Sequence, residues 1–169
     1  SNLHLLTVSL TDERFGPVGH SDSNWQQLED RGLHLPGATL VPVLNGENLG
    51  RTAEDFSVFL ESALSGNDYR IGFLGIGPDG HTAGILPDSP AIDSQTDASA
   101  YSDGDIPSES PAGVKRGIDR ITMTGRAIVR LDEAVVYATG EKKWTVLDDL
   151  ETEKPINGQP AQLLKKVPK

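Results

Sequence analysis

The sequence predicts a single α/β domain over residues 1–169, with a mostly parallel twisted sheet and helices on both faces. Apolar, partly β-branched runs alternate along the chain with segments of helical periodicity, as expected where crossover helices join parallel strands. The length of 169 residues and the 36% hydrophobic content suit one domain around one core. The chain has no internal repeat and no cysteine, so neither a repeat architecture nor a disulfide framework is indicated.

The composition excludes several classes of partner. A formal net charge of -10 disfavours nucleic acid and anionic membrane surfaces, because both attract basic faces. A small anionic ligand is still compatible with this charge, since a few local cations outweigh a distant negative field. The lack of cysteine is typical of the cytoplasm, and no stretch has the length and apolarity that a bilayer or a secretory leader requires. We expect a cytoplasmic monomer or homodimer.

The first quarter of the chain is expected to form a strand, a short helix and a second strand. Residues 3–10 are apolar, as in a strand buried on both faces, and the abruptly charged residues 11–14 follow them. Serines at 21 and 23 can cap a helix over 24–31. A second strand is expected over 38–44, where a turn-prone Asn-Gly pair ends it.

The middle of the chain predicts a helix and the strand that leads into the most distinctive motif. Residues 51–64 read as an amphipathic helix that Gly66 ends. Its apolar residues at helical spacing are Phe56, Phe59, Leu60 and Leu64. The apolar run over 69–76 predicts a buried, central strand.

The second half begins with residues 87–117, which are rich in Pro, Ser, Asp and Gly and predict a loop with one short strand over 98–102. This loop either covers the surface or closes over a substrate. The remaining elements are expected in the order strand, strand, helix and helix, over residues 119–124, 134–139, 141–150 and 161–165.

The strand over 69–76 runs directly into the turn Gly77-Pro78-Asp79-Gly80-His81. Open α/β sheets place their ligands at the carboxyl ends of strands, and glycines let a substrate approach the backbone. The near-neutral pKa of histidine suits general-base chemistry, so His81 is the candidate catalytic base, although a lone histidine is more often structural. Asp79 either orients the imidazole or bonds its own turn.

Residues 75–80, at the end of the strand and the start of this turn, formally match G-x-G-x-x-G, but their context does not suit a nucleotide. A dinucleotide site needs a long helix that opens at the glycines, and Pro87 and Pro90 interrupt any such helix. A Walker loop is excluded because His81 stands where that motif has lysine. No G-x-S-x-G elbow and no close histidine spacing is present, so neither a nucleophilic serine nor a metal is called for, and no cofactor is expected.

Three cations are candidates for binding an anionic substrate. Arg14 follows the first predicted strand, and its planar guanidinium offers paired donors; the neighbouring acidic residues Asp12 and Glu13 could instead hold it in place. Lys143 lies in the first turn of a predicted helix, where the helix dipole disfavours a cation unless an anion binds there. Arg120 adds positive charge to an acidic protein. Ordinary surface positions remain the alternative for these side chains.

These motifs together resemble the 6-phosphogluconolactonase family, within the larger group of glucosamine-6-phosphate isomerase-like proteins. LGIGPDGHTAGILP resembles the signature around the catalytic histidine, and TDERFGPVGHSDSN resembles the family's DER segment with its following H-x-x-SN. DRITMT, TGEKKWTVL and the late Pro160-Ala161 pair resemble later blocks in the same order. The resemblance implies the NagB/RpiA/CoA-transferase-like fold and covers nearly all of the chain.

The resemblance implies hydrolysis of 6-phospho-D-glucono-1,5-lactone to 6-phosphogluconate, without a cofactor and with a small sugar phosphate as the partner. His81 would deprotonate the attacking water, and Asp79 would support it. The substrate-binding residues it implies are Arg14, Gly77, Gly80, Arg120 and Lys143. The alternatives are a glucosamine-6-phosphate deaminase-like enzyme, which the residues TAGILP after the histidine disfavour, and a non-catalytic sugar-phosphate binder on the same fold.

The sequence departs from the family pattern at two places. Gly84 stands where lactonases commonly have serine, a change expected only to loosen a local hydrogen bond. The family's S-G-G-S-T-P phosphate loop has no counterpart in the chain. We therefore expect residues 1–169 to be the C-terminal two-thirds of a longer domain, with weak or no activity alone.

Overall fold

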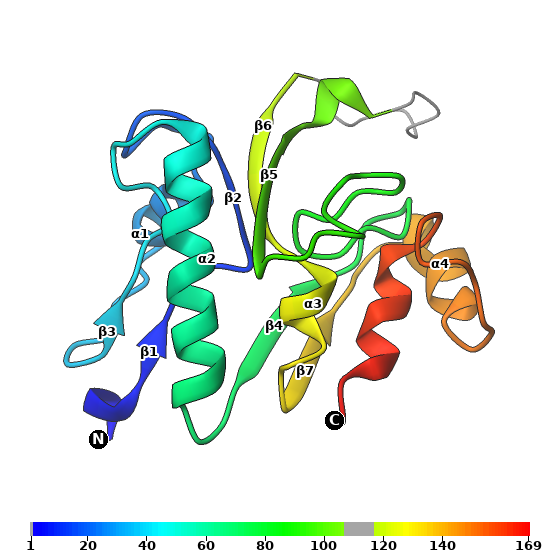
Figure 1. Cartoon of the computed structure of the whole chain (residues 1–169). Helices are drawn as coiled ribbons and strands as arrows, with labels where there is room; N and C mark the ends of the chain where they lie inside the picture. Colours follow the sequence, from blue (N-terminus) through cyan, green and yellow to red (C-terminus); the bar gives the residue numbers. More distant parts are fainter. Residues whose placement is uncertain (1, 107–116) are drawn as a thin grey trace.

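The computed structural model describes residues 2–106 and 117–169 (Figure 1). Strands and helices alternate through much of these ranges, which confirms the predicted α/β class. The strands are β1 (Thr7–Val8), β2 (Asp12–Arg14), β3 (Thr39–Leu40), β4 (Ile71–Gly75), β5 (Ala98–Ser102), β6 (Asp119–Met123) and β7 (Glu133–Tyr137). The α-helices are α1 (Asn24–Asp30), α2 (Leu49–Gly66), α3 (Gly125–Ile128) and α4 (Trp144–Asp149).

The described strands form three small sheets. β1 pairs with β3 and β4 with β7, both in parallel, as expected for strands joined by crossover segments. The third sheet, in the order β2-β6-β5, is antiparallel and was not predicted. Its edge strand β2 is the charged segment that the sequence analysis placed between elements. Polar residues suit both faces of β2, because Glu13 accepts hydrogen bonds from the start of α1 and its neighbours face the candidate site.

The core forms where α2 packs against the antiparallel sheet (Figure 1). The helix starts two residues before the predicted one because Asn48 caps it, its side chain accepting a hydrogen bond from the Arg51 amide at 3.0 Å. Three residues of the expected apolar stripe are buried, and the fourth, Phe59, is half-buried. They belong to one cluster with Ile121 and Met123 of β6, among others. Burying each large apolar side chain contributes about 1.5–3 kcal/mol, so this contact makes a large contribution to stability.

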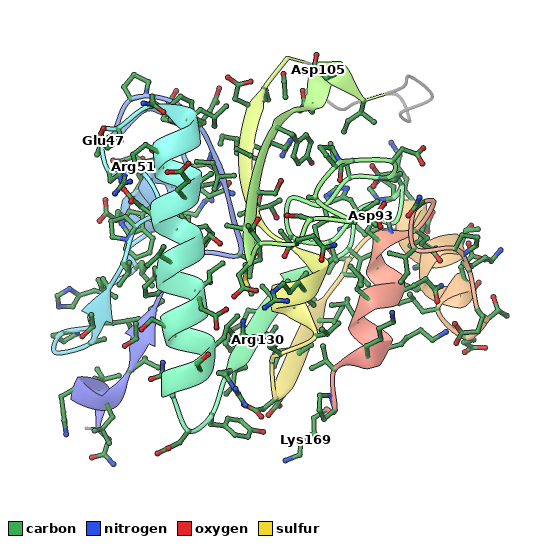
Figure 2. The ribbon with its side chains drawn as sticks, viewed as in Figure 1. Glu47, Arg51, Asp93, Asp105, Arg130 and Lys169 are labelled. Atoms are coloured by element: carbon green, nitrogen blue, oxygen red, sulfur yellow. The ribbon has the colours of Figure 1, made fainter. Side chains whose placement is uncertain are left out.

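Ion pairs add a second connection between α2 and the rest of the domain. Arg130, labelled in Figure 2, donates to Glu61 of α2 at 2.8 Å and to the buried Asp97 at 2.5 Å. Arg126 adds a third bond, to Asp97, at 3.1 Å. Burial raises the pKa of Asp97, whereas the hydrogen bond from Arg130 lowers the pKa of Glu61 to about 2. This cluster of charged side chains thus holds together segments that are far apart in sequence.

The N-terminal strand is shorter and less buried than predicted. Residues Leu3–Leu5 form a 3-10 turn, and Leu5 is 74% exposed. Only Thr7 and Val8 pair, with their two partners in β3. The expectation of a strand buried on both faces over 3–10 is therefore wrong. An apolar segment is buried only where other residues pack over it, and the described residues leave Leu5 largely uncovered.

The strand before the glycine-rich turn is buried on one face only. Leu74 is 3% exposed, but Phe73 beside it is 75% exposed. Among the described strands β4 pairs only with β7, so it lies at an edge and not at the centre of a sheet. Tyr137, opposite Gly75 in register, is also exposed and extends the same apolar face. The run over 69–76 is apolar at nearly every position, so it predicted a strand buried on both faces. Without an alternation of polar and apolar residues, the sequence could not show that one face is exposed.

The C-terminal region matches the predicted order with changes of helix type. The predicted helix over 141–150 consists of a 3-10 turn at Glu141–Lys143 followed by α4. The last helix is a 3-10 segment, Pro160–Lys166. The strand over 98–102 is confirmed as β5, and residues 107–116 of the predicted loop lie outside the described residues. Helix α3 was not predicted, because its four residues span little more than one helical turn and show no periodicity.

No helix in the described ranges is long and apolar enough to cross a membrane.

Candidate active site

The turn from Gly77 to His81 is closed by its own backbone at the carboxyl end of β4. The Gly77 amide donates to the His81 carbonyl at 2.9 Å, and the Gly80 amide donates to the Gly77 carbonyl at 3.0 Å. Gly80 has φ +82°, a conformation that favours glycine. The preceding residue Ile76 is buried, so the turn projects from a fixed point of the fold.

His81 and Asp79 form a hydrogen-bonded pair within this turn. His81 Nδ1 lies 2.6 Å from Asp79 Oδ1, and the His81 amide also donates to that oxygen at 3.2 Å. The aspartate side chain is 4% exposed and the imidazole 33%. His81 Nε2 makes no hydrogen bond within the described part of the chain. A buried carboxylate thus orients an imidazole whose other nitrogen is open to a reactant, which is the arrangement a general base needs.

The electrostatics of Asp79 favour its ionised form. Burial alone would raise its pKa, but the hydrogen bonds and the charge of His81 outweigh burial, so the pKa of Asp79 lies below its ordinary value. The second carboxylate oxygen, Oδ2, is buried and has no hydrogen-bond partner among the described residues. A group that donates to Oδ2 would complete the site.

The two glycines predicted to bind substrate have clear packing roles. A Cβ at Gly77 would lie 2.1 Å from the His81 ring, so the imidazole packs directly over this residue. A Cβ at Gly80 would lie 2.5 Å from Gln159 Cγ. The Ala161 amide donates to the Gly80 carbonyl at 2.8 Å, so the C-terminal segment fixes the turn from the other side. Substrate binding by the backbone of Gly77 and Gly80 stays a prediction.

Arg14 lies on β2, at the edge of the antiparallel sheet. Its Nη1 donates to the Asp22 carbonyl at 3.2 Å, and its backbone carbonyl contacts His20 Nε2 at 3.0 Å. Its Nε is buried without a partner among the described residues. A buried guanidinium nitrogen without an acceptor is costly, so an oxygen of a ligand is the natural partner for it.

Arg120 stands opposite Arg14 in the register of β6 and β2. Residues directly opposite across a ladder present their side chains on the same face, so the structure brings the two arginines together. Arg120 is held by Asp103, through Nε at 3.1 Å and Nη2 at 3.0 Å. It contributes positive charge to this face from a fixed position.

Asp12 belongs to the same face and was assigned by the sequence analysis only as a possible partner of Arg14. It is half-buried, and desolvation raises its pKa, although the charges of Arg14 and Arg120 oppose the rise. Asp12 also packs against Gly84, since a Cβ at Gly84 would lie 2.9 Å from Asp12 Cβ, and Gly84 is three residues beyond the candidate base. The signal in the sequence was its spacing of two residues from Arg14, which puts both on one face once the segment is read as a strand.

Lys143 lies in the 3-10 turn after β7. Because Gly75 and Tyr137 are paired in parallel, the segments after β4 and β7 leave the sheet at the same end. Lys143 is half-buried, and its ammonium group makes no hydrogen bond or ion pair within the described part of the chain, so this group is available at that end.

Gly84 is explained by packing. A Cβ there would lie 2.9 Å from the Cβ atoms of both Asp12 and Thr122. Its amide donates to Thr122 Oγ1 at 3.0 Å. The departure from serine therefore does more than loosen a hydrogen bond, because a side chain at 84 would push the loop away from Asp12.

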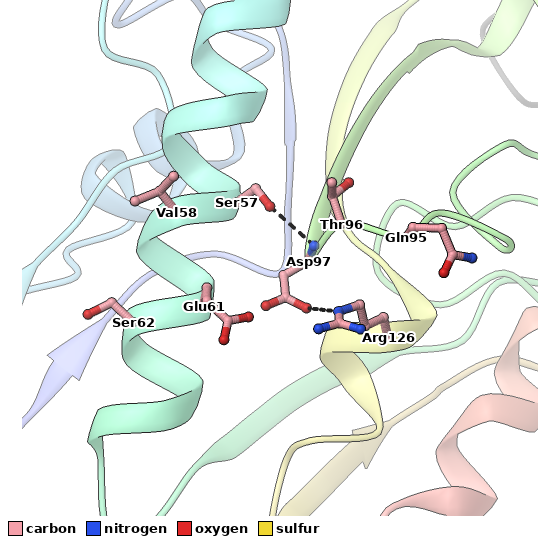
Figure 3. A pocket seen from close by; sticks show the side chains of 8 residues that line it. All are labelled: Ser57, Val58, Glu61, Ser62, Gln95, Thr96, Asp97 and Arg126. Carbon is pink, nitrogen blue, oxygen red and sulfur yellow. Dashed lines mark hydrogen bonds and ion pairs between the residues drawn. The ribbon is translucent and has the colours of Figure 1, made fainter.

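A groove of about 480 Å³ lies apart from these residues, between α2 and the segment that enters β5 (Figure 3). Asp97 at its floor bonds the Arg126 side chain, and its amide donates to Ser57 Oγ at 3.2 Å. None of the predicted site residues lines this groove. The described residues also contain no group of three or more metal-ligating side chains placed to hold an ion.

The family model for glucosamine-6-phosphate isomerases and 6-phosphogluconolactonase matches residues 2–168. The 6-phosphogluconolactonase of Caulobacter vibrioides is 30% identical over 156 residues, which cover 89% of this chain and 65% of that protein. The human 6-phosphogluconolactonase is 28% identical over 94% of this chain and 60% of its own length. The matched segment therefore spans somewhat less than two-thirds of the length of each of these two relatives.

Solved structures show the same fold. The 6-phosphogluconolactonase of Trypanosoma brucei matches 94% of this chain and 66% of its own, with a TM-score of 0.72 and 26% identity. A 6-phosphogluconolactonase of Shewanella baltica matches 96% and 68%, with a TM-score of 0.75 and 21% identity. A monomeric glucosamine-6-phosphate deaminase is similar in fold alone, with a TM-score of 0.71 and 18% identity.

Proposed function

Because the chain belongs to the family of glucosamine-6-phosphate isomerases and 6-phosphogluconolactonases, we propose that the protein hydrolyses 6-phospho-D-glucono-1,5-lactone to 6-phosphogluconate. The observation that carries the proposal is the 2.6 Å hydrogen bond between His81 Nδ1 and Asp79 Oδ1, with His81 Nε2 open. The proposal concerns the whole protein to which this sequence belongs, since the relatives that carry the activity in their names are longer.

The chemistry follows from this pair. Neutral His81 takes a proton from water at Nε2 as the water oxygen attacks the lactone carbonyl carbon. Asp79 holds the proton on Nδ1 and stabilises the imidazolium that forms. The tetrahedral intermediate then breaks its bond to the ring oxygen, which accepts the proton from His81 and leaves as the sugar hydroxyl. One water is consumed, and the product is a carboxylic acid that ionises.

The face that carries Arg14 and Arg120 supports binding of the anionic substrate. The unpartnered Nε of Arg14 is buried, so an oxygen of the substrate would satisfy it. Arg120 is neutralised in part by Asp103, and we assign it a supporting electrostatic role. Lys143, at the strand end shared with the turn, is the third candidate cation, and we assign it to the phosphate because its ammonium group has no partner among the described residues.

The test is a hydrolysis assay with 6-phospho-D-glucono-1,5-lactone, corrected for spontaneous opening of the lactone. His81→Asn and Asp79→Asn are each expected to lower kcat about 10²–10⁴-fold, because each removes general-base assistance. His34→Asn changes a histidine outside the site and is the matched control, with kcat expected to stay the same. Turnover retained in His81→Asn would refute the proposed mechanism.

A deaminase-like activity is the second candidate, and Asp12 is the observation that favours it. A half-buried carboxylate with a raised pKa on this face could serve as an additional acid/base group on an amino sugar phosphate. Release of ammonia from glucosamine 6-phosphate distinguishes the two activities.

We also place the protein in the cytoplasm, a compartment that suits a chain without cysteine; cell fractionation tests this localisation.

A further inference from the structure

Tyr101 stands on the sheet face that lines the candidate site. In the antiparallel sheet it lies directly opposite Arg120, which in turn lies opposite Arg14. The three side chains therefore share one face. Tyr101 is 7% exposed, and burial raises the pKa of its phenol to about 12, so the hydroxyl keeps its proton.

The phenol hydroxyl bonds the loop that follows His81 at two points. It donates to the Gly84 carbonyl and accepts from the Leu86 amide at 3.4 Å. From the neighbouring strand, Thr122 Oγ1 accepts from the Gly84 amide at 3.0 Å. Two adjacent strands thus bind both backbone groups of Gly84, only three residues beyond the imidazole.

The conformation of this loop needs such support. Ala83 has φ +50°, in the left-handed region that a residue with a Cβ adopts at a cost. Thr82, before it, is fully buried and donates to the Gly75 carbonyl at 2.9 Å. His81 is therefore held between its closed turn and a strained loop whose shape depends on bonds from outside the loop.

The loop also sets the position of Asp12. Gly84 packs so tightly that even a Cβ would come within 2.9 Å of Asp12 Cβ. A shift of the loop toward or away from the sheet would change the distance between Asp12 and His81. The hydroxyl of Tyr101 opposes such a shift, whereas the ring alone would only fill space.

We propose that Tyr101 is a positioning residue, which through its hydroxyl holds the loop at residues 82–86 and thereby sets His81 and Asp12 relative to each other. Its kinetic consequence rests on the proposed lactone hydrolysis; its structural consequence does not. Misplacing a catalytic group by about 1 Å costs on the order of 10²-fold in rate. Loss of the hydroxyl should therefore lower kcat and leave binding of the substrate little changed.

The test compares Tyr101→Phe with Tyr69→Phe, a matched change at a residue that is 49% exposed. In isotope-labelled protein, Tyr101→Phe should shift the ring resonances of His81 and reduce the hydrogen-exchange protection of the Leu86 amide about tenfold or more. In the lactone assay it should lower kcat about 10–100-fold with KM changed less than about twofold. Tyr69→Phe should change none of these quantities.

A second pair of variants distinguishes the loss of a single hydrogen bond to the loop from a general loss of folding. Thr122→Ser keeps the hydroxyl that accepts from the Gly84 amide, and Thr122→Val removes it at nearly constant volume. Only the valine variant should shift His81. If His81 resonances stay unchanged in both Tyr101→Phe and Thr122→Val, the positioning role is refuted even where lactone hydrolysis is observed. If the wild-type protein lacks lactonase activity but the resonances shift, the proposed function fails and the positioning role stands.

Discussion

Gly77→Ala offers the most direct test of how the turn is built. The added Cβ would lie 2.1 Å from His81 Nδ1 and Cε1 and 2.6 Å from Asp79 Oδ1. Non-bonded carbon contacts are normally about 3.5–4.0 Å, so the ring must move by more than about 1 Å or the backbone must shift. The methyl group cannot be accommodated without one of these changes.

Either response costs stability. If the imidazole swings out, the 2.6 Å bond to Asp79 is lost, and a hydrogen bond to a charged group contributes about 1.5–3 kcal/mol. If the turn moves instead, overpacking of this kind costs about 1–3 kcal/mol. We expect the free energy of unfolding of Gly77→Ala to fall by about 1–3 kcal/mol on either route.

The measurement is urea unfolding, together with the nitrogen resonances of the His81 ring. Gly66→Ala is the matched control, because no atom lies within 4 Å of the point that its added methyl group would occupy, and Gly66 ends α2. Alanine at that position should be neutral or stabilise by up to about 1 kcal/mol. A Gly77→Ala protein with wild-type stability and unchanged His81 resonances would show that the ring does not pack over Gly77.

Three further predictions concern burial and charge. The pKa of Asp12 is raised in the folded protein, so the free energy of unfolding falls as the pH rises above 3.8 and the carboxyl ionises. Asparagine does not ionise, so Asp12→Asn should gain stability relative to wild type between about pH 3 and pH 7, as measured by urea unfolding. Phe56→Ala should cost about 3–5 kcal/mol and Phe73→Ala less than about 0.5, because their exposures are 4% and 75%, as thermal unfolding would show. Arg130→Met should cost somewhat less than the about 3–5 kcal/mol of a broken buried pair, because one other bond to Asp97 survives.

Each of these has an outcome that contradicts it. A pH-independent difference for Asp12→Asn would mean that its carboxyl titrates alike in both states. Equal losses for the two phenylalanine variants would show that the face carrying Phe73 is covered in solution. For the ion pair, Arg51→Met is the control at a side chain 58% exposed, and an equal loss in both arginine variants would remove the special role of Asp97.

Sequence patterns correctly predicted the elements that depend on interactions between residues close in sequence. The helix over Leu49–Gly66 follows from apolar residues at helical spacing, and the turn Gly77 to His81 follows from an apolar run that ends in glycines. The pair of His81 with Asp79 was predictable for the same reason, since residues two apart in a tight turn can bond each other. The other site residues could be predicted only as individual candidates at different strand ends, and their positions relative to one another could not be predicted.

The charged segment Asp12–Arg14 shows where sequence reasoning fails. No element was predicted over these charged residues, yet the segment is a strand, because β6 supplies its hydrogen bonds and the start of α1 supplies partners for Glu13. These partners are distant along the chain, so no local pattern reports them. The same reason hid Asp12, which shares a face with Arg14 and Arg120 only after β2 and β6 pair.

By itself, the sequence determined the α/β class, the order of most elements, the glycine-rich turn that carries His81 and, through its motifs, the family. The tertiary structure alone decided that β4 is exposed on one face, that Arg14 and Arg120 share a face with Asp12, and that Tyr101 and Thr122 bind the loop at Gly84. The physical reason is that periodicity encodes which side chains avoid water, whereas register and long-range hydrogen bonds encode which of them meet.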